Sequence, residues 1–127
     1  MAKQLTSNVS KEKNGTKLSK DALRFKIAIT GNLFNDYDFK KLKKESNKTF
    51  HTFLDETVGK QLSITSVESL FLKTKGKPSF KEVINGKKRD VFHFGKKNTK
   101  FRIFGYYNDD GYFVICRIDP NHNFQKV

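Results

Sequence analysis

The chain has 127 residues, 13 of them Phe, and a formal net charge of +13 that comes from 26 basic and 13 acidic side chains. This length corresponds to one small domain, and the Phe side chains are large enough to fill its core. The apolar runs are too short for a membrane-spanning helix, and the single cysteine, Cys116, excludes a disulfide scaffold and a cysteine-rich zinc site.

Residues 1–20 form a polar segment rich in Lys, Ser and Asn, with few and scattered apolar side chains. We expect a disordered basic arm there, followed by a single α+β domain over residues 21–127. The lysines of the arm suit a solvated leader as well as they suit phosphate binding. The start of the chain has no apolar run with a small-residue cleavage site, so a cytoplasmic protein is expected.

Apolar and polar residues alternate over residues 23–29, which predicts a first strand with one face buried. Asp38 then provides an N-cap for a helix over about residues 39–58, whose apolar side chains share one broad face. Gly59 provides a stop at the end of this helix. Most lysines of the helix fall on the opposite face, where solvent is a sufficient explanation for them.

A second, shorter helix is predicted over about residues 66–73, because residues 65–68 have the Thr-Ser-Val-Glu pattern of a capping box. The alternation of apolar side chains over residues 62–66 leaves a strand as the alternative there. Gly76 and Pro78 indicate that a loop follows.

Three strands come next, at residues 91–94, 101–107 and 112–118. Asn85–Gly86 marks a tight turn before the first of them, and an Asn-Asp-Asp-Gly turn at residues 108–111 joins the last two. The element order β-α-α-β-β-β predicts an α+β fold in which two helices pack on a small, mainly antiparallel sheet. Cys116 lies in the most apolar strand, so we expect it to be a core side chain and not a nucleophile.

The charge favours a polyanionic partner, because a small body with so many cations attracts phosphates and releases their counterions. Residues 73–102 hold eleven basic and two acidic side chains, and residues 40–48 hold five Lys and one Glu. We therefore expect a basic face built by the middle of the chain. Since 22 of the basic residues are Lys and only four are Arg, a compositional bias toward Lys is the alternative. The candidate nucleic-acid-binding residues are Lys87, Lys88, Arg89, Lys96, Lys97 and Lys100.

The stretch from Ile84 to Phe124 resembles the C-terminal half of the RelE/ParE superfamily of bacterial type II toxins. The shared features are, in chain order, Ile84, Gly86, the strand at residues 91–94, the aromatic-Arg-apolar run Phe101-Arg102-Ile103, the acidic turn at residues 108–111, and an apolar strand followed by His122. Over residues 22–75 only the order of the elements corresponds.

The resemblance implies a RelE-like fold and a protein that binds RNA or the ribosome, with an acidic antitoxin as a second partner. In the nuclease branch it implies mRNA cleavage without metal or cofactor, in which the 2′-hydroxyl attacks the adjacent phosphorus. That chemistry needs a base, an acid and cations around the phosphate. The candidate catalytic residues follow from the resemblance by position. Arg102 matches the Arg after the aromatic residue of the hairpin strand, and His122 lies in the region after the last strand, where the family often has a basic residue or His. His93 lies on the preceding strand, where the family often has Lys or another polar residue. A second branch, which poisons gyrase, keeps the fold without these residues, and the sequence does not separate the two.

Each of the three candidates also has a purely structural interpretation. Arg102 can pack its stem on neighbouring aromatic rings instead of binding a phosphate. His122 can stabilise the C-terminal turn, with Asp119 as its partner, instead of exchanging protons. His93 faces away from the two Phe residues that flank it, so we expect it on the outer sheet face near Arg102, where it can also be a simple exposed polar residue.

Neither a cofactor nor a metal is expected, because the glycines occur singly and the histidines have no partners at ligand spacing. The apolar face of the first predicted helix is weak in its middle, at Ser46 and Asn47, so no strongly amphipathic Lys helix with a clean apolar face supports a membrane partner. The alternative to a toxin is a non-catalytic basic protein of a phage or mobile element that binds a host factor or nucleic acid without turnover.

Overall fold

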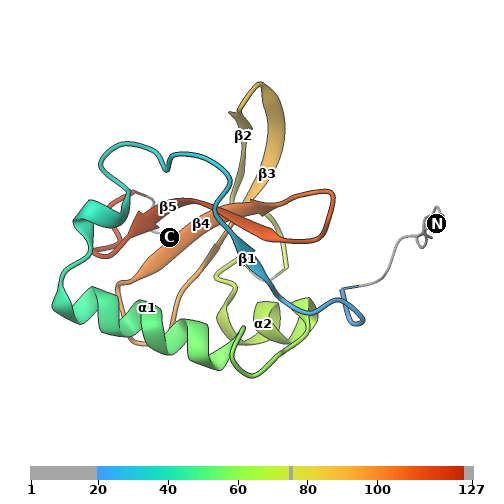
Figure 1. The fold of residues 1–127 in the computed structure, drawn as a ribbon, viewed down its shortest axis with the longest axis horizontal. Coiled ribbons are helices and arrows are strands. Elements are labelled where there is room, and N and C mark those ends of the chain that lie inside the picture. Colours follow the sequence, from blue (N-terminus) through green and yellow to red (C-terminus); the bar gives the residue numbers. More distant parts are fainter. Residues whose placement is uncertain (1–19, 75, 125–127) are drawn as a thin grey trace.

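Eight short elements make up the part of the chain that the computed structural model describes, residues 20–74 and 76–124 (Figure 1). In chain order they are β1 (Ile27–Ala28), the 3₁₀ helix η1 (Phe39–Lys41), α1 (Lys44–Glu56), α2 (Ile64–Phe71), β2 (Phe80–Ile84), β3 (Lys87–Phe94), β4 (Arg102–Tyr107) and β5 (Phe113–Asp119). Apart from Lys20, the basic arm expected over residues 1–20 lies outside the described residues.

The strands form one mixed sheet in the order β1-β5-β4-β3-β2. β1 runs parallel to β5, and the other three neighbouring pairs are antiparallel. The expected α+β class, the mainly antiparallel sheet and the side-by-side arrangement of the last three predicted strands are confirmed. No helix of the described residues is long and apolar enough to span a membrane.

β2 was not predicted from the sequence, and it adds a strand to the predicted order. β2 pairs with β3 across the turn at Asn85 and Gly86, whose φ angles of 52° and 81° are those of a tight hairpin turn. The turn itself was predicted, but the residues before it have no clear apolar face, since Val83 is exposed and Phe80 is half-buried. β1 is also shorter than the strand predicted over residues 23–29.

The first predicted helix is wrong at its start. The Asp38 carboxylate accepts the Lys40 N–H at 3.0 Å, but it caps η1, and the chain is extended at Leu42 and Lys43 before α1 begins. α1 then ends at Glu56, short of the expected stop at Gly59. Because the predicted helix is interrupted here, Lys41 and Lys43 lie just before α1 and not within it.

The second predicted helix is confirmed as α2, and the strand alternative is wrong. Its N-cap is Ser63, whose hydroxyl accepts the Ser66 N–H at 3.1 Å, so the helix begins two residues earlier than expected. At its middle, the Glu68 carboxylate accepts the Tyr107 hydroxyl at 2.8 Å. This bond attaches α2 to β4.

α1 and α2 cover the same face of the sheet, and the main hydrophobic core lies between these layers (Figure 1). Its centre is aromatic: Phe25 lies 5.4 Å from Phe94 and 5.8 Å from Phe113, measured between ring centroids. Phe53 of α1 contacts Phe25 edge-on at 6.4 Å. Edge-to-face packing of this kind favours one arrangement of the rings, so the helices are held in a defined position.

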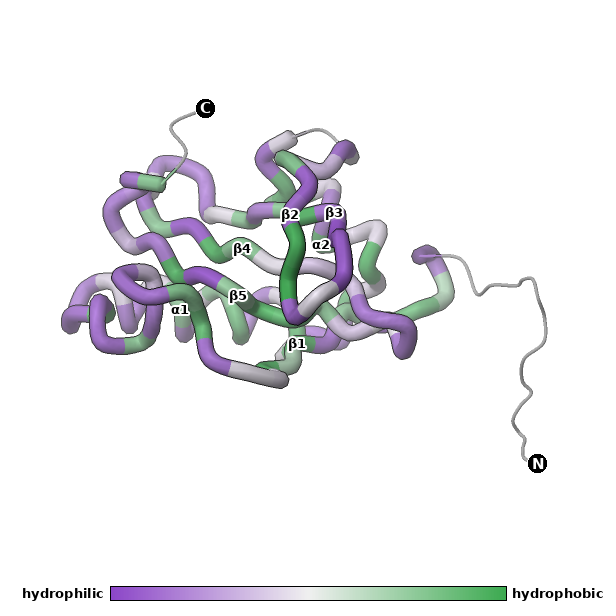
Figure 2. Tube along the Cα trace, turned by 90° about the horizontal axis from the view of Figure 1, so that it is seen from above, coloured by the Kyte–Doolittle hydropathy of each residue, from purple (hydrophilic) through white to green (hydrophobic). Residues whose placement is uncertain are grey.

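A second hydrophobic cluster covers the opposite face of the sheet. Figure 2 shows the β2–β3 hairpin lying across β4 and β5 on this side. The buried members of the cluster are Ile84, Val91, Phe104, Tyr106, Val114 and Cys116. Cys116 is therefore a core residue, as expected, and burial raises its pKa to about 11, which disfavours the nucleophilic thiolate. Because both faces are covered, the sheet offers no broad open face to a partner in the described part of the chain.

A buried ion pair attaches the hairpin to the sheet. Arg117 of β5 donates two hydrogen bonds to the Glu82 carboxylate of β2, at 2.7 and 2.8 Å. The guanidinium lies between two aromatic rings, 3.9 Å from the centroid of Phe34 and 4.2 Å from that of Phe124. The pair thus joins β2, β5, the segment after β1 and the C-terminal segment at one point.

Removing Glu82 should be costly, because the Arg117 side chain is only 7% exposed and would lose its counter-charge. We expect Glu82→Ala to lower the free energy of unfolding by about 3 kcal/mol or more, the typical cost of breaking a buried pair. Asp90→Ala is the matched control on the same hairpin: its partner Lys81 is 61% exposed, and exposed pairs contribute at most about 1 kcal/mol. Urea denaturation measures both, and equal losses would show that the Arg117 pair has no special role.

Candidate nucleic-acid interface

The three residues predicted to be catalytic lie together at one end of the sheet. Arg102 begins β4 and is the cross-strand neighbour of Asp119, which ends β5. His93, near the end of β3, is the cross-strand neighbour of Phe104. His122 follows β5 in a turn, and its backbone N–H donates to the Asp119 carbonyl at 3.4 Å. Sequence alone placed these residues on three segments, and the sheet register brings the segments together.

The expected exposure of His93 is wrong. Its side chain is fully buried, stacks on Phe104 with a centroid distance of 4.9 Å, and shares a short hydrogen bond with the Ser79 hydroxyl. The face opposite Phe92 and Phe94 was correctly identified, but the hairpin covers that face. Burial, and secondly the charge of Arg102, lower the pKa of His93 to about 4. His93 is therefore neutral at pH 7 and out of contact with solvent.

Arg102 is not an open phosphate clamp. Only 9% of it is exposed, and one terminal nitrogen of its guanidinium donates to the carbonyls of Thr99 and Phe101, at 2.7 and 2.8 Å. Its stem lies over Gly95, where a Cβ atom would come within 2.6 Å of the Arg102 Cδ. Gly95 is therefore required for the path of this side chain. The structural interpretation of Arg102 is favoured, although its partners are backbone carbonyls instead of aromatic rings.

His122 is half-buried in the turn that follows β5. It adopts a left-handed backbone conformation, with φ of 55°, and its Nε2 atom is buried without a hydrogen-bond partner among the described residues. The Asp119 carboxylate accepts the N–H groups of Asn123 and Phe124 at 2.9 and 2.8 Å, so it stabilises the turn. Asp119 thus organises this segment, but through backbone amides and not through the imidazole.

Two further residues complete this group and were missed by the sequence analysis. Ser79 contacts His93, and Lys73 lies close enough to Arg102 that burial and then this neighbouring cation lower the pKa of its ammonium. Both lie in the loop between α2 and β2, which the sequence marks only by Gly76 and Pro78. We name the group of Lys73, Ser79, His93, Arg102, Asp119 and His122 the strand-end cluster.

The six predicted nucleic-acid-binding residues do not form one surface. Lys87, Lys88 and Arg89 begin β3 at the hairpin turn, whereas Lys96, Lys97 and Lys100 follow its other end. The strand of eight residues from Lys87 to Phe94 is about 25 Å long, so the two groups lie at opposite ends of β3. Two of the six are also engaged: Lys96 pairs with Glu56 at 2.7 Å, and Arg89 stacks on Tyr106 at 4.4 Å.

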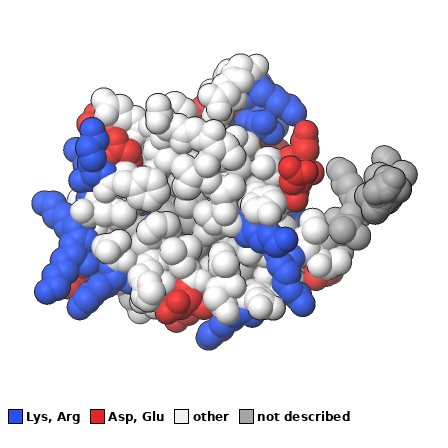
Figure 3. Space-filling model, viewed as in Figure 1, with Lys and Arg blue, Asp and Glu red and all other residues white. Residues whose placement is uncertain are grey.

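Figure 3 shows the same separation on the face it presents. Lys and Arg side chains lie in distinct groups at the margin of the molecule, with acidic side chains between them and a largely uncharged centre. The basic face expected from residues 40–48 and 73–102 is therefore divided into separate groups on the side that Figure 3 shows. The reason is geometric: a strand places the cations at its two ends on opposite sides of the domain.

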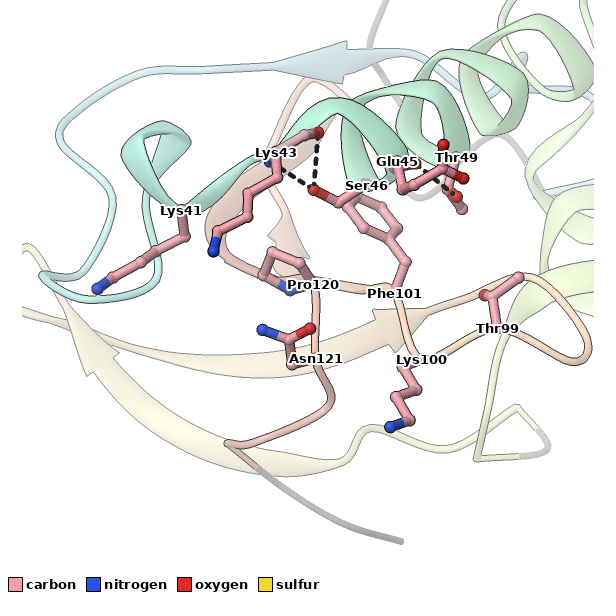
Figure 4. A pocket seen from close by; sticks show the side chains of 10 residues that line it. All are labelled: Lys41, Lys43, Glu45, Ser46, Thr49, Thr99, Lys100, Phe101, Pro120 and Asn121. Atoms are coloured by element: carbon pink, nitrogen blue, oxygen red, sulfur yellow. Dashed lines mark hydrogen bonds between the residues drawn. The ribbon is translucent and has the colours of Figure 1, made fainter.

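One of these marginal groups brings together lysines that are far apart in the chain. Lys41 and Lys43 precede α1, Lys100 precedes β4, and all three line a pocket of about 240 Å³ whose floor includes Pro120 and Asn121. Figure 4 shows Lys43 and Lys100 on either side of Pro120 and Asn121, with Lys41 beside them. We name this site the lysine groove. All three lysines are exposed.

The start of α1 is part of the groove and adds to its positive potential. The Lys43 N–H donates to the Ser46 hydroxyl at 2.7 Å, which fixes the first turn of the helix (Figure 4). The N-terminus of a helix carries a partial positive charge, which adds to that of the lysines. Glu45 partly offsets this charge, and the Asp36 carboxylate lies 3.9 Å from the Lys41 ammonium at the margin. For Lys43 and Lys100 the described residues provide no ion pair.

Within the described residues, no group of three or more His, Cys, Asp or Glu side chains could hold a metal ion. Comparison of the chain with models of protein families, with curated proteins and with solved structures gives no match. The function is therefore inferred from the geometry of the chain's own residues. The two sites that this geometry provides are the lysine groove and the strand-end cluster.

The neutral, buried His93 makes stability depend on pH in a defined direction. Unfolding returns its pKa from about 4 to 6.5, so between these values the unfolded chain binds a proton that the folded chain does not. The free energy of unfolding should therefore fall as the pH is lowered from 6.5 to 4, by up to roughly 3 kcal/mol for a shift of this size. Urea denaturation at several pH values measures this.

Two variants isolate the contribution of His93. His93→Gln removes the titrating group and should flatten the dependence of stability on pH between 4 and 6.5. His51→Gln is the control, because the side chain of His51 is 74% exposed on α1, and this change should leave the dependence as in the natural chain. Parallel pH profiles for the natural chain and His93→Gln would contradict the assignment.

Proposed function

We propose that this protein binds RNA through the lysine groove, as free message or on the ribosome, as its resemblance to the RelE/ParE toxins implies. The observation that supports the proposal is the convergence of Lys41, Lys43 and Lys100 on one concave site from two separate parts of the chain. Exposed lysines that line one pocket suit the phosphates of a nucleic-acid strand, and each phosphate contacted releases condensed counterions.

Binding without cleavage is the function that the geometry favours. Acid–base chemistry on a phosphodiester needs side chains that reach the substrate. His93 is fully buried and Arg102 is 9% exposed, so a bound strand meets neither of them in this conformation. By contrast, the lysine groove is open. The alternative of a non-catalytic basic protein from a phage or mobile element is consistent with the same site.

RNA cleavage is the second candidate, and the composition of the strand-end cluster is the observation that favours it. Arg102, His93 and His122 lie together beside Asp119, and residues next to Asp119 line the lysine groove. A strand bound in the groove thus passes the half-buried His122. In a RelE-like toxin of this kind, an acidic antitoxin would cover the cations in the cytoplasm, and a small acidic protein encoded by an adjacent gene is the expected partner.

Neutralising the groove should weaken RNA binding more than neutralising other lysines. We expect the triple change Lys41→Gln, Lys43→Gln and Lys100→Gln to weaken binding of a single-stranded RNA at least tenfold. The plot of log affinity against log salt has a negative slope, and its magnitude should decrease by about one for each phosphate that the variant no longer neutralises. Fluorescence anisotropy over a salt series, with the full chain, provides both values.

The control for this variant removes the same charge elsewhere. Lys60→Gln, Lys87→Gln and Lys88→Gln change three exposed lysines that do not line the groove. This variant should retain most of the affinity. Equal weakening by both triple changes would mean that net charge, and not the lysine groove, determines binding.

Expression in bacteria tests the cleavage candidate. If the protein is a ribosome-dependent nuclease, its induction should arrest growth and cut translated mRNA, and the double change Arg102→Ala and His122→Ala should relieve both effects. Because Arg102 is buried, the single change His122→Ala serves as a second variant, and circular dichroism verifies that each variant folds. Intact transcripts during arrest would eliminate the nuclease and leave the binding function.

A further inference from the structure

A second pocket, of about 520 Å³, adjoins the lysine groove and shares Lys41, Lys43, Pro120 and Asn121 with it. The carboxylates of Asp36 and Asp119 also line this second pocket. Its other lining residues include Tyr37 and Asn123. We propose that this pocket holds one unpaired base of a bound RNA strand against the ring of Tyr37, so that the protein selects single-stranded RNA over duplex. The inference rests on the proposed RNA-binding function and specifies the form of RNA that the site takes.

Tyr37 is held in place by backbone and side-chain contacts. Its carbonyl accepts the Ile118 N–H at 2.6 Å, and its N–H donates to the Phe34 carbonyl at 3.0 Å, so its backbone is attached to β5. Its ring meets that of Phe124 edge-on, with a centroid distance of 5.3 Å. Phe124 in turn packs against Phe104 at 5.2 Å. A ring fixed in this way can stack on a base without losing further conformational freedom.

The polar groups divide the combined site into a part for phosphates and a part for a base. Lys41 and Lys43 line both pockets, and Lys100 extends the cationic part away from Tyr37. The pocket of Tyr37 has the amides of Asn123 and of the shared Asn121, which can both donate to and accept from the edge of a base. The Asp36 and Asp119 carboxylates line the same pocket and disfavour a phosphate there. The nucleotide backbone therefore runs along the lysines, with one base turned toward Tyr37.

This arrangement distinguishes single strands from other polyanions. In a duplex the bases are stacked and paired inside the helix, so none can reach Tyr37 without being extruded. An unpaired base has two free faces, and stacking on an aromatic side chain contributes about 1–3 kcal/mol per base. A polyphosphate carries the charge but no base. It should therefore use the lysines alone.

The test compares three polyanions on the full chain by fluorescence anisotropy or by competition: a single-stranded RNA, the duplex of the same sequence, and inorganic polyphosphate. We expect Tyr37→Leu to weaken single-stranded RNA about tenfold and to leave polyphosphate unchanged within a factor of two. Tyr37→Phe keeps the ring and should bind as the natural chain does. An RNA with abasic sites should bind the natural chain about tenfold more weakly than the intact RNA does, and this comparison uses no variant.

The outcomes separate this inference from the function on which it rests. One outcome is that Tyr37→Leu binds single-stranded RNA as well as the natural chain does, and that the natural chain binds the abasic strand as well as the intact RNA. If the groove variant, the triple change Lys41→Gln, Lys43→Gln and Lys100→Gln, then binds RNA weakly, the proposed base pocket is wrong and RNA binding by the lysine groove is retained. If the groove variant also binds normally, RNA binding through this site is wrong altogether. Equal affinity of the natural chain for duplex and single strand would likewise overturn the base pocket.

Discussion

The buried pairing of Arg117 with Glu82, held between Phe34 and Phe124, is the contact on which the arrangement of this domain depends. It closes the β2–β3 hairpin onto the sheet and holds the C-terminal segment and the segment after β1 beside each other. Burying charge is costly unless the pair is well aligned and stacked. Here two hydrogen bonds and two aromatic faces offset that cost. The same contact holds Phe124, whose ring packs against that of Tyr37. The ion pair that attaches the hairpin therefore also supports the ring that we propose to stack on a base.

Covering both faces of a small sheet determines where a partner can bind. A chain of this size has a large surface relative to its interior, and aromatic side chains fill two separate clusters instead of one. As a result, polar residues that point away from the helices, such as His93 and Arg102, become buried. Exposed lysines lie around the margin of the domain, for example at Lys60 after α1 and at Lys87 and Lys88 in the hairpin, and three of them line the lysine groove. Of these places, the lysine groove is the one where lysines from two separate parts of the chain line the same pocket.

Local patterns in the sequence predicted most of the architecture and little of the site. Alternation and turn residues located β3, β4 and β5, because their side chains and turns follow local rules. The face of His93 followed from the same alternation, but its burial did not, since a period of two cannot tell whether another segment covers that face. The lysine groove could not be predicted either, because Lys43 and Lys100 are far apart in the sequence and line the same pocket only in the folded chain. β2 was missed because exposed Val83 weakens its apolar pattern.

The parallel pairing of β1 with β5 joins residues near opposite ends of the chain, Ile27 with Phe113. Bringing such distant segments together costs chain entropy that local hairpins avoid. The meander of β2 to β5 can therefore assemble first, and β1 docks last, through a short stretch of pairing. The segment that contains Tyr37 likewise depends on β5, because the Tyr37 carbonyl accepts the Ile118 N–H, so this segment becomes ordered only after β5 is available. Hydrogen exchange at the Phe113 amide, which donates to the Lys26 carbonyl at 2.8 Å, would report that final docking step.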